Sequence, residues 1–132
     1  KTGLTAALEE LVVRAKQAQP GLEVQFFSNY PLDEVAGLSK IHLYRIVQEL
    51  LGNVLKHAKA KHLNIQLLEN EGNLLLTAED DGLGFDPKNM ESDGIGLSNI
   101  RTRAEVLRAT MHLDTAPGKG TFVSVEIPKE GL

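Results

Sequence analysis

The stretch Glu49-Leu-Leu-Gly-Asn53-Val-Leu-Lys56-His57 combines an acid, an amide and basic side chains within an otherwise apolar run. Because an α-helix repeats every 3.6 residues, the four polar side chains are expected on one face, with the leucines and the valine facing a core. An amide oxygen suits Mg²⁺, a lysine can neutralise phosphate charge, and a carboxylate can orient or deprotonate a nucleophile or hold a metal-bound water. The same stripe would also suit an ordinary solvated helix face, so the rest of the chain must decide.

This stretch belongs to a predicted helix over about residues 40–60, with Ser39 as its N-cap. Gly52 lies inside that helix, where glycine costs about 1 kcal/mol relative to alanine. A glycine at such a position usually has a packing or access reason. Beside Asn53, it would leave room for a ligand.

Composition limits the possible classes of protein. The 132 residues fit one domain, and 42% hydrophobic with 24% charged residues is typical of a globular protein. A net charge of −4 argues against general nucleic-acid binding, and the absence of cysteine excludes disulfides and thiolate metal sites. No apolar run approaches the ~20 residues of a membrane span. Because the chain begins at Lys1, without Met or a signal-like segment, we expect it to be a piece of a longer protein.

Periodicity predicts the other elements. Three-four spacing of apolar residues predicts a helix over residues 4–15, and another helix is expected to begin near residue 96. Alternation predicts strands over residues 22–26, 63–67, 74–78, 111–115 and 122–127, with a hairpin turn over residues 70–73. Three helices with about five strands predict an α+β two-layer sandwich.

A second polar motif, Asp80-Asp-Gly82-Leu-Gly84, follows the third predicted strand. An aspartate there can accept a hydrogen bond from an exocyclic amine such as that of adenine, and glycines let the backbone approach a ligand. The alternative is an ordinary turn, in which Asp and Gly are common. The acidic spacing does not match an EF-hand, and Pro87 occupies the third glycine position of a dinucleotide fingerprint.

Two further glycine motifs lie downstream. Gly94-Ile-Gly96-Leu97 precedes a helix, where free N–H groups can bind phosphate, although a hinge would explain it equally well. The segment before Thr121, Gly118-Lys-Gly120, superficially resembles a phosphate-binding loop, but a strand follows it where a helix is required. We interpret it as a hairpin turn from which Thr121 could reach a neighbouring site. No pair of histidines has zinc-site spacing with a third ligand.

The order of these pieces is more specific than any one of them. A helix with Asn53, the turn from Asp80, the Gly94-x-Gly96 helix start and the Gly120-Thr121 strand start resemble the four sequence boxes of the Bergerat ATP-binding fold. Gyrase, Hsp90, sensor histidine kinases and MutL-type proteins share that fold. The resemblance covers about residues 40–128, and it implies a mixed sheet of about five strands packed on three helices.

Within that fold, the chain most resembles the catalytic ATP-binding domain of sensor histidine kinases that pair with NarL/LuxR-type response regulators. The matching segments are Tyr44-Arg-Ile-Val-Gln-Glu49 with Lys56-His-Ala58, Gly94-Ile-Gly-Leu97 leading to Arg101, and Gly120-Thr-Phe-Val-Ser-Val-Glu-Ile-Pro128. The chain departs from that subgroup at Arg108-Ala109, where a glycine pair is common, but this difference affects only a turn.

The resemblance implies a role for each matching residue. Asp80 would bind the adenine amine with help from Thr121 through water, and Asn53 would hold Mg²⁺. Lys56 and His57 would face phosphate. Glu49 matches the acid that activates water in the ATPase members, while its role in a kinase stays open. The pocket and its lid, residues 85–93, would be shaped by Gly82, Gly84, Gly94, Gly96 and Leu97.

The resemblance therefore implies an ATP-dependent protein histidine kinase domain. It would bind Mg-ATP and donate the γ-phosphate to a histidine on a separate dimerisation domain, which would lie upstream of residues 1–132. The other expected partner is a NarL/LuxR-type response regulator, with no direct nucleic-acid partner. We expect a monomeric fragment of a homodimeric parent, placed in the cytoplasm, and the sequence leaves open whether the parent is membrane-anchored.

Three other functions remain to be weighed. An anti-sigma-factor serine kinase of the same fold is the main alternative, since such proteins are similarly short and also pair a Glu with an Asn. An ATP-driven clamp like gyrase is disfavoured by the short expected lid and the lack of a following transducer domain. A degenerate nucleotide sensor is disfavoured because Glu49, Asn53 and Asp80 are all present.

Overall fold

The computed structural model describes residues 3–86 and 97–132. Two predicted site residues, Gly94 and Gly96, and most of the expected lid lie outside these ranges, as does the side chain of His57. The α-helices are α1 (Leu4–Ala18), α2 (Gly37–Asn53) and α3 (Leu97–Val106). The strands are β1 (Glu23–Ser28), β2 (His62–Asn70), β3 (Asn73–Asp80), β4 (Thr110–Thr115) and β5 (Thr121–Ile127).

All five strands form one mixed sheet in the order β1-β2-β3-β5-β4. β1 and β2 run parallel, and the remaining pairs are antiparallel. The predicted hairpin turn joins β2 to β3, where Asn70 pairs with Asn73. Its two central residues, Glu71 and Gly72, have φ of 52° and 88°, the positive values that suit the right-handed twist of a tight hairpin.

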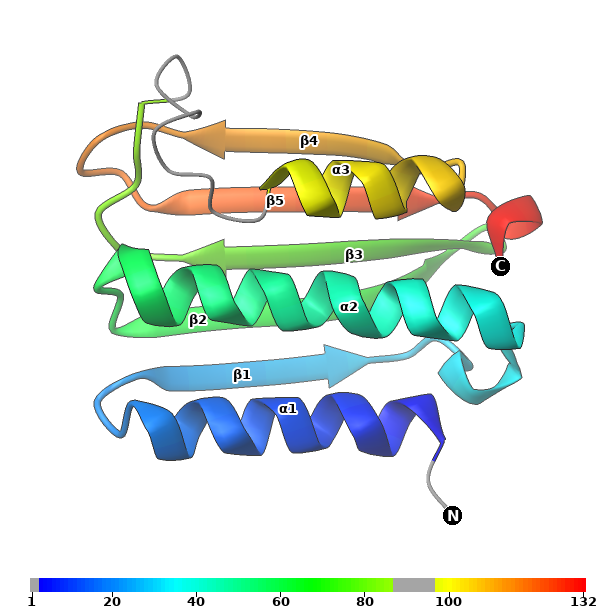
Figure 1. The fold of residues 1–132 in the computed structure, drawn as a ribbon, viewed down its shortest axis with the longest axis horizontal. Coiled ribbons are helices and arrows are strands. Elements are labelled where there is room, and N and C mark those ends of the chain that lie inside the picture. Colours follow the sequence, from blue (N-terminus) through cyan, green and yellow to red (C-terminus); the bar gives the residue numbers. More distant parts are fainter. Residues whose placement is uncertain (1–2, 87–96) are drawn as a thin grey trace.

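The helices pack on one face of this sheet (Figure 1). Successive strand side chains point to opposite faces, and the inward positions are the apolar ones that alternation predicted. Core side chains on the three central strands include Leu63, Ile65, Leu67, Leu74, Leu76, Ala78, Val123, Val125 and Ile127. The opposing helices contribute Leu8, Leu43, Ile46, Val47, Leu50 and Ile100. The predicted α+β two-layer architecture is thereby confirmed.

The central helix differs from prediction at both ends. It begins at Gly37 with Ala36 as N-cap, so the predicted cap at Ser39 is wrong; the Ser39 hydroxyl instead donates to the carbonyl of Gly131 at 2.9 Å. The α-helix ends at Asn53, and a π-helical turn, η2 (Val54–Ala58), completes it. Such turns have i→i+5 bonding and occur often at functional sites. Lys56 and His57 therefore lie in a π-helical turn and not in the predicted α-helix.

The end of α3 has the geometry of a Schellman cap. The backbone N–H of Ala109 donates to the carbonyl of Ala104 at 2.8 Å, and that of Arg108 to the carbonyl of Glu105 at 3.0 Å. Arg108 itself has φ of +60°. Glycine is the usual residue at this left-handed position, so an arginine there is strained.

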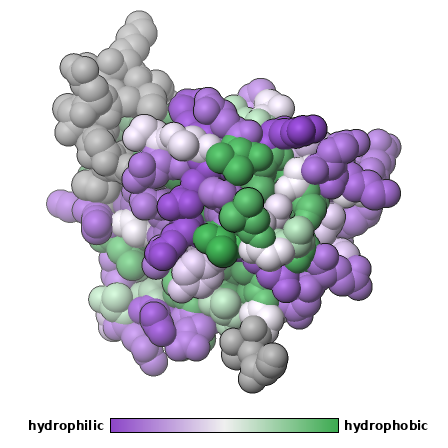
Figure 2. Space-filling model, turned by 45° about the vertical axis from the view of Figure 1, so that its right-hand side comes forward, coloured by the Kyte–Doolittle hydropathy of each residue, from purple (hydrophilic) through white to green (hydrophobic). Residues whose placement is uncertain are grey.

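The N-terminal end of α2 carries exposed apolar surface. Leu38 and Ile41 lie on its first turns, 67% and 56% exposed. Figure 2 brings that end of the molecule forward and shows hydrophobic surface near its centre, with hydrophilic residues around it. Within the described residues, no helix is long and apolar enough to cross a membrane.

Candidate functional site

Several chain segments meet at one end of the sheet. The C-terminal ends of α2, β3 and β4 and the first residues of β5 lie at this end (left in Figure 1). The register fixes the strand neighbours: Asp80 pairs with Thr121, and Thr121 pairs with Thr115. Segments that are far apart in the sequence thus bring the predicted base-binding residues together.

Asp80 is the last residue of β3, half-buried on the inward side of the strand. Its Oδ1 accepts a hydrogen bond from the N–H of Gly82 at 2.8 Å, which closes a tight turn. Burial raises the pKa of Asp80, and the Gly82 N–H opposes that rise. A carboxylate in such partly dehydrated surroundings is a strong acceptor for a ligand that brings its own hydrogen-bond donor.

Two glycines let this turn pack against the β4–β5 hairpin. Gly84 has φ of +65°, and a Cβ added there would lie 2.1 Å from the carbonyl oxygen of Ala116. Gly120 has φ of +74°, and its Cβ would lie 2.3 Å from the carbonyl oxygen of Asp80. Any larger residue at either position would push the Asp80 turn away from Thr121.

Thr115 connects three parts of this end. Its Oγ1 lies 2.9 Å from the carbonyl oxygen of Gly120 and 3.0 Å from Oγ1 of Thr121. It also accepts a hydrogen bond from the N–H of Phe85 at 3.1 Å. Alternation predicted Thr115 as the last residue of a strand and indicated no role for it. The available signal was a polar residue at an inward position, after Met111 and Leu113 in the same alternation.

The predicted polar stripe of α2 ends at the same end of the sheet (Figure 1). Glu49, Gly52 and Asn53 are half-buried and Lys56 is exposed, while Leu50, Leu51 and Val54 are buried as predicted. A Cβ added at Gly52 would meet no atom within 4 Å, so open space lies beside Asn53. Downstream, Leu97 is buried at the start of α3. The roles of these residues stay predictions.

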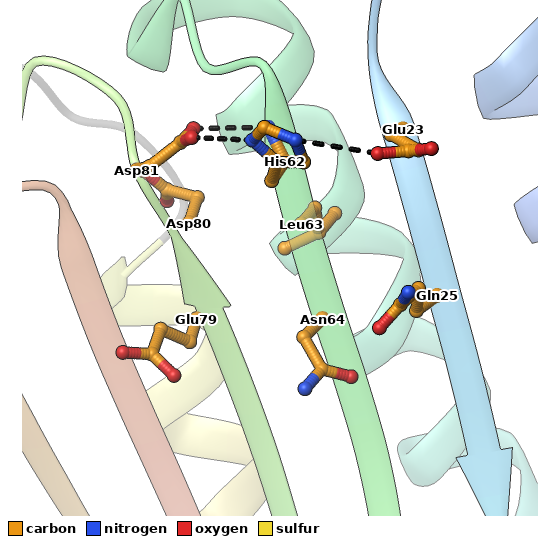
Figure 3. A pocket seen from close by; sticks show the side chains of 8 residues that line it. All are labelled: Glu23, Gln25, His62, Leu63, Asn64, Glu79, Asp80 and Asp81. Carbon is orange, nitrogen blue, oxygen red and sulfur yellow. Dashed lines mark hydrogen bonds and ion pairs between the residues drawn. The ribbon is translucent and has the colours of Figure 1, made fainter.

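A second polar cluster lies beside Asp80, around Asp81 (Figure 3). The Asp81 carboxylate accepts from the N–H groups of Lys61 and His62 at 2.8 and 2.9 Å, and lies 2.7 Å from Nδ1 of His62. Nε2 of His62 lies 3.2 Å from Glu23. The His62 hydrogen bond lowers the pKa of Asp81 to about 2, and Asp81 raises the pKa of His62.

Asp81 therefore joins the end of β3 to the start of β2. The sequence pattern gave neither His62 nor Asp81 a role of its own. The adjoining cavity has a volume of about 240 Å³. No group of three acidic, histidine or cysteine side chains in the described ranges could hold a metal ion.

Comparison with protein families gives one match over most of the chain. The family described as "Histidine kinase-, DNA gyrase B-, and HSP90-like ATPase" matches residues 39–131. Sensor histidine kinase ComP of Bacillus subtilis is 37% identical over 131 residues, which cover 95% of this chain and 16% of ComP. Oxygen sensor histidine kinase NreB of Staphylococcus carnosus is 33% identical over 112 residues, which cover 82% of this chain and 31% of NreB. The chain thus spans less than a third of either relative.

Solved structures share the fold. The histidine kinase domain of the Erythrobacter litoralis blue-light activated histidine kinase superposes with a TM-score of 0.79 at 24% identity, covering 97% of this chain and 62% of that one. The catalytic domain of histidine kinase ThkA superposes with a TM-score of 0.76 at 15% identity, covering 99% and 97%.

Proposed function

The chain belongs to the family of histidine kinase-, DNA gyrase B- and HSP90-like ATPases, and we propose that it binds Mg-ATP for a two-component sensor histidine kinase. One observation carries this proposal: the half-buried Asp80 and Thr121 lie side by side at the sheet end where the polar stripe of α2 terminates. The strand ends thus offer acceptors to a base, and the end of α2 offers groups suited to a metal and phosphates.

The base would lie against the strand ends. Asp80 would accept a hydrogen bond from the adenine amine, with Thr121 beside it. Gly82 and Gly84 keep this turn in place, through the hydrogen bond to Asp80 and the close approach to Ala116. A purine would also exclude water from the carboxylate, which strengthens a charge-assisted hydrogen bond.

The triphosphate would lie along the end of α2. Asn53 offers the neutral oxygen that suits Mg²⁺, an ion that takes few protein ligands and completes its shell with phosphate and water. Lys56 is exposed and free to reach phosphate oxygens. The open space at Gly52 supports a ligand passing beside Asn53. His57, Gly94, Gly96 and Leu97 remain proposed pocket residues on the strength of the resemblance.

Bound Mg-ATP supplies the γ-phosphoryl group, which would pass to a histidine on a separate dimerisation domain. Transfer of this kind needs positioning and charge neutralisation more than covalent chemistry from the protein. Glu49, one helical turn before Asn53, could orient the attacking nitrogen or hold a metal-bound water. The proposed partners are that phosphoacceptor domain and a NarL/LuxR-type response regulator, within a homodimeric parent.

The test is phosphorylation of the longer sensor chain with radiolabelled ATP. We expect the label to be lost in acid, because phosphohistidine is acid-labile. The Asn53→Ala variant should not be labelled, although circular dichroism should show that it is folded. Acid-stable label would instead support the anti-sigma-factor serine kinase alternative. Labelling that survives Asn53→Ala would contradict the metal role of Asn53.

A further inference from the structure

Thr115 is the one buried polar or charged side chain in the part of the chain that the structure describes, at 9% exposure. Its hydroxyl contacts the β4–β5 hairpin at Gly120, the first residue of β5 at Thr121, and the chain beyond the Asp80 turn at Phe85. It thus joins three segments on the strand side of the proposed nucleotide site.

The hydrogen atoms at this junction can be assigned from chemistry. A hydroxyl has one proton and two lone pairs, a carbonyl only accepts, and a backbone N–H only donates. Thr115 must therefore give its proton to the Gly120 carbonyl and accept from the N–H of Phe85. Its 3.0 Å contact with Thr121 is then a hydrogen bond only if Thr121 is the donor.

With this assignment, the Thr121 hydroxyl can act only as a hydrogen-bond acceptor toward a ligand. Its proton is held toward Thr115, so it can offer only lone pairs to a ligand or to a bridging water. Its strand partner Asp80 carries a carboxylate, which also only accepts when ionised. Two acceptors side by side suit an amino group and repel the lone pairs of an oxo group.

We propose that Thr115 is a positioning residue that orients the Thr121 hydroxyl as an acceptor and so sets a preference for 6-amino over 6-oxo purine nucleotides. This inference rests on the proposed ATP site. Without the Thr115 hydroxyl, Thr121 could rotate and donate to an oxo group.

The test compares affinities for Mg-ATP and Mg-ITP by titration calorimetry. The two nucleotides share ribose and triphosphate, so the ratio of their dissociation constants isolates the effect of the amino or oxo group on the base. Thr115→Val keeps the side-chain shape and removes the hydroxyl, and it should lower the ATP preference by about fivefold, the worth of one hydrogen bond. Thr115→Ser keeps the hydroxyl and should retain the wild-type preference. If Thr115→Val weakens both nucleotides equally, Thr115 has only a structural role and the inference is overturned.

A second variant covers the case in which Thr115→Val does not fold. Thr121→Val removes the acceptor itself, so it should weaken Mg-ATP binding without weakening Mg-ITP binding; equal losses would overturn the inference. A wild-type chain that binds neither nucleotide would contradict the proposed function and this inference together. A wild-type chain that prefers ATP, with Thr115→Val retaining that preference, would overturn this inference alone.

Discussion

Replacing Gly120 by alanine should separate the two residues that form the proposed base site. Gly120 has φ of +74°, and a left-handed conformation costs a non-glycine residue roughly 1–2 kcal/mol. The new Cβ would lie 2.3 Å from the carbonyl oxygen of Asp80, a backbone atom that can yield only if the strands shift. Overpacking of this kind costs about 1–3 kcal/mol. We therefore expect Gly120→Ala to lose about 3 kcal/mol of unfolding free energy.

The same hairpin supplies a matched control. Gly118 has φ of +79°, but a Cβ there would meet no atom within 4 Å. Gly118→Ala should therefore lose only the conformational part, about 1–2 kcal/mol. Urea unfolding of both variants gives the difference, and calorimetry with Mg-ATP should show weakened binding for Gly120→Ala alone. Equal losses of stability in the two variants would refute the close approach between Gly120 and Asp80.

Three other substitutions probe separate parts of the fold. Arg108→Gly should raise the unfolding free energy by about 1 kcal/mol because it relieves the left-handed arginine, whereas Arg108→Ala should not; an equal gain in both would implicate the side chain instead. The pair of Asp81 and His62 should contribute stability at intermediate pH. The contribution of Asp81 is lost as the pH falls below 3.8 and its carboxylate is protonated. The contribution of His62 is lost as the pH rises above 6.5 through its raised folded pKa. NMR titration should show the pKa of His62 falling in Asp81→Asn, and an unchanged value would contradict the pairing. Gly52→Ala should add about 1 kcal/mol of stability yet weaken Mg-ATP binding, and unchanged affinity would mean that the ligand does not use that space.

The individual strands could be predicted from the sequence because their rules are local. Strand alternation separates the inward from the outward side chains directly, and the Asn70-Glu-Gly-Asn73 segment carries the residues that a two-residue hairpin turn needs. The buried residues of α1 and α2 likewise follow helical spacing. In each of these elements, burial against one partner layer reinforces the local preference.

The limits of α2 could not be predicted because distant contacts decide them. The Ser39 hydroxyl has a capping signature, yet it bonds to Gly131, 92 residues further along the chain. The π-helical turn shifts the hydrogen-bond ladder by one residue, and side-chain periodicity does not reveal that. Since Lys56 lies in this turn, α-helical spacing alone could not place it.

The placement of the proposed base-binding residues could be predicted from the sequence, whereas the contacts that support them could not. Asp80 and Thr121 stand at strand ends that the resemblance identified, and the register confirms that they are neighbours. Thr115 and Asp81 act through hydrogen bonds to segments 30 and 20 residues away. Such pairings depend on strand order, which alternation does not supply.

The most direct test of the central claim is the affinity of the chain for Mg-ATP with and without the Asp80 carboxylate. Asparagine keeps an oxygen that can accept from Gly82, so Asp80→Asn should leave the turn and the unfolding free energy close to wild type. Titration calorimetry should show Mg-ATP binding to the wild-type chain and a loss of about tenfold or more in Asp80→Asn, the worth of a hydrogen bond to a charged group. An unchanged dissociation constant in a folded Asp80→Asn variant would contradict the assignment of this sheet end as the adenine site.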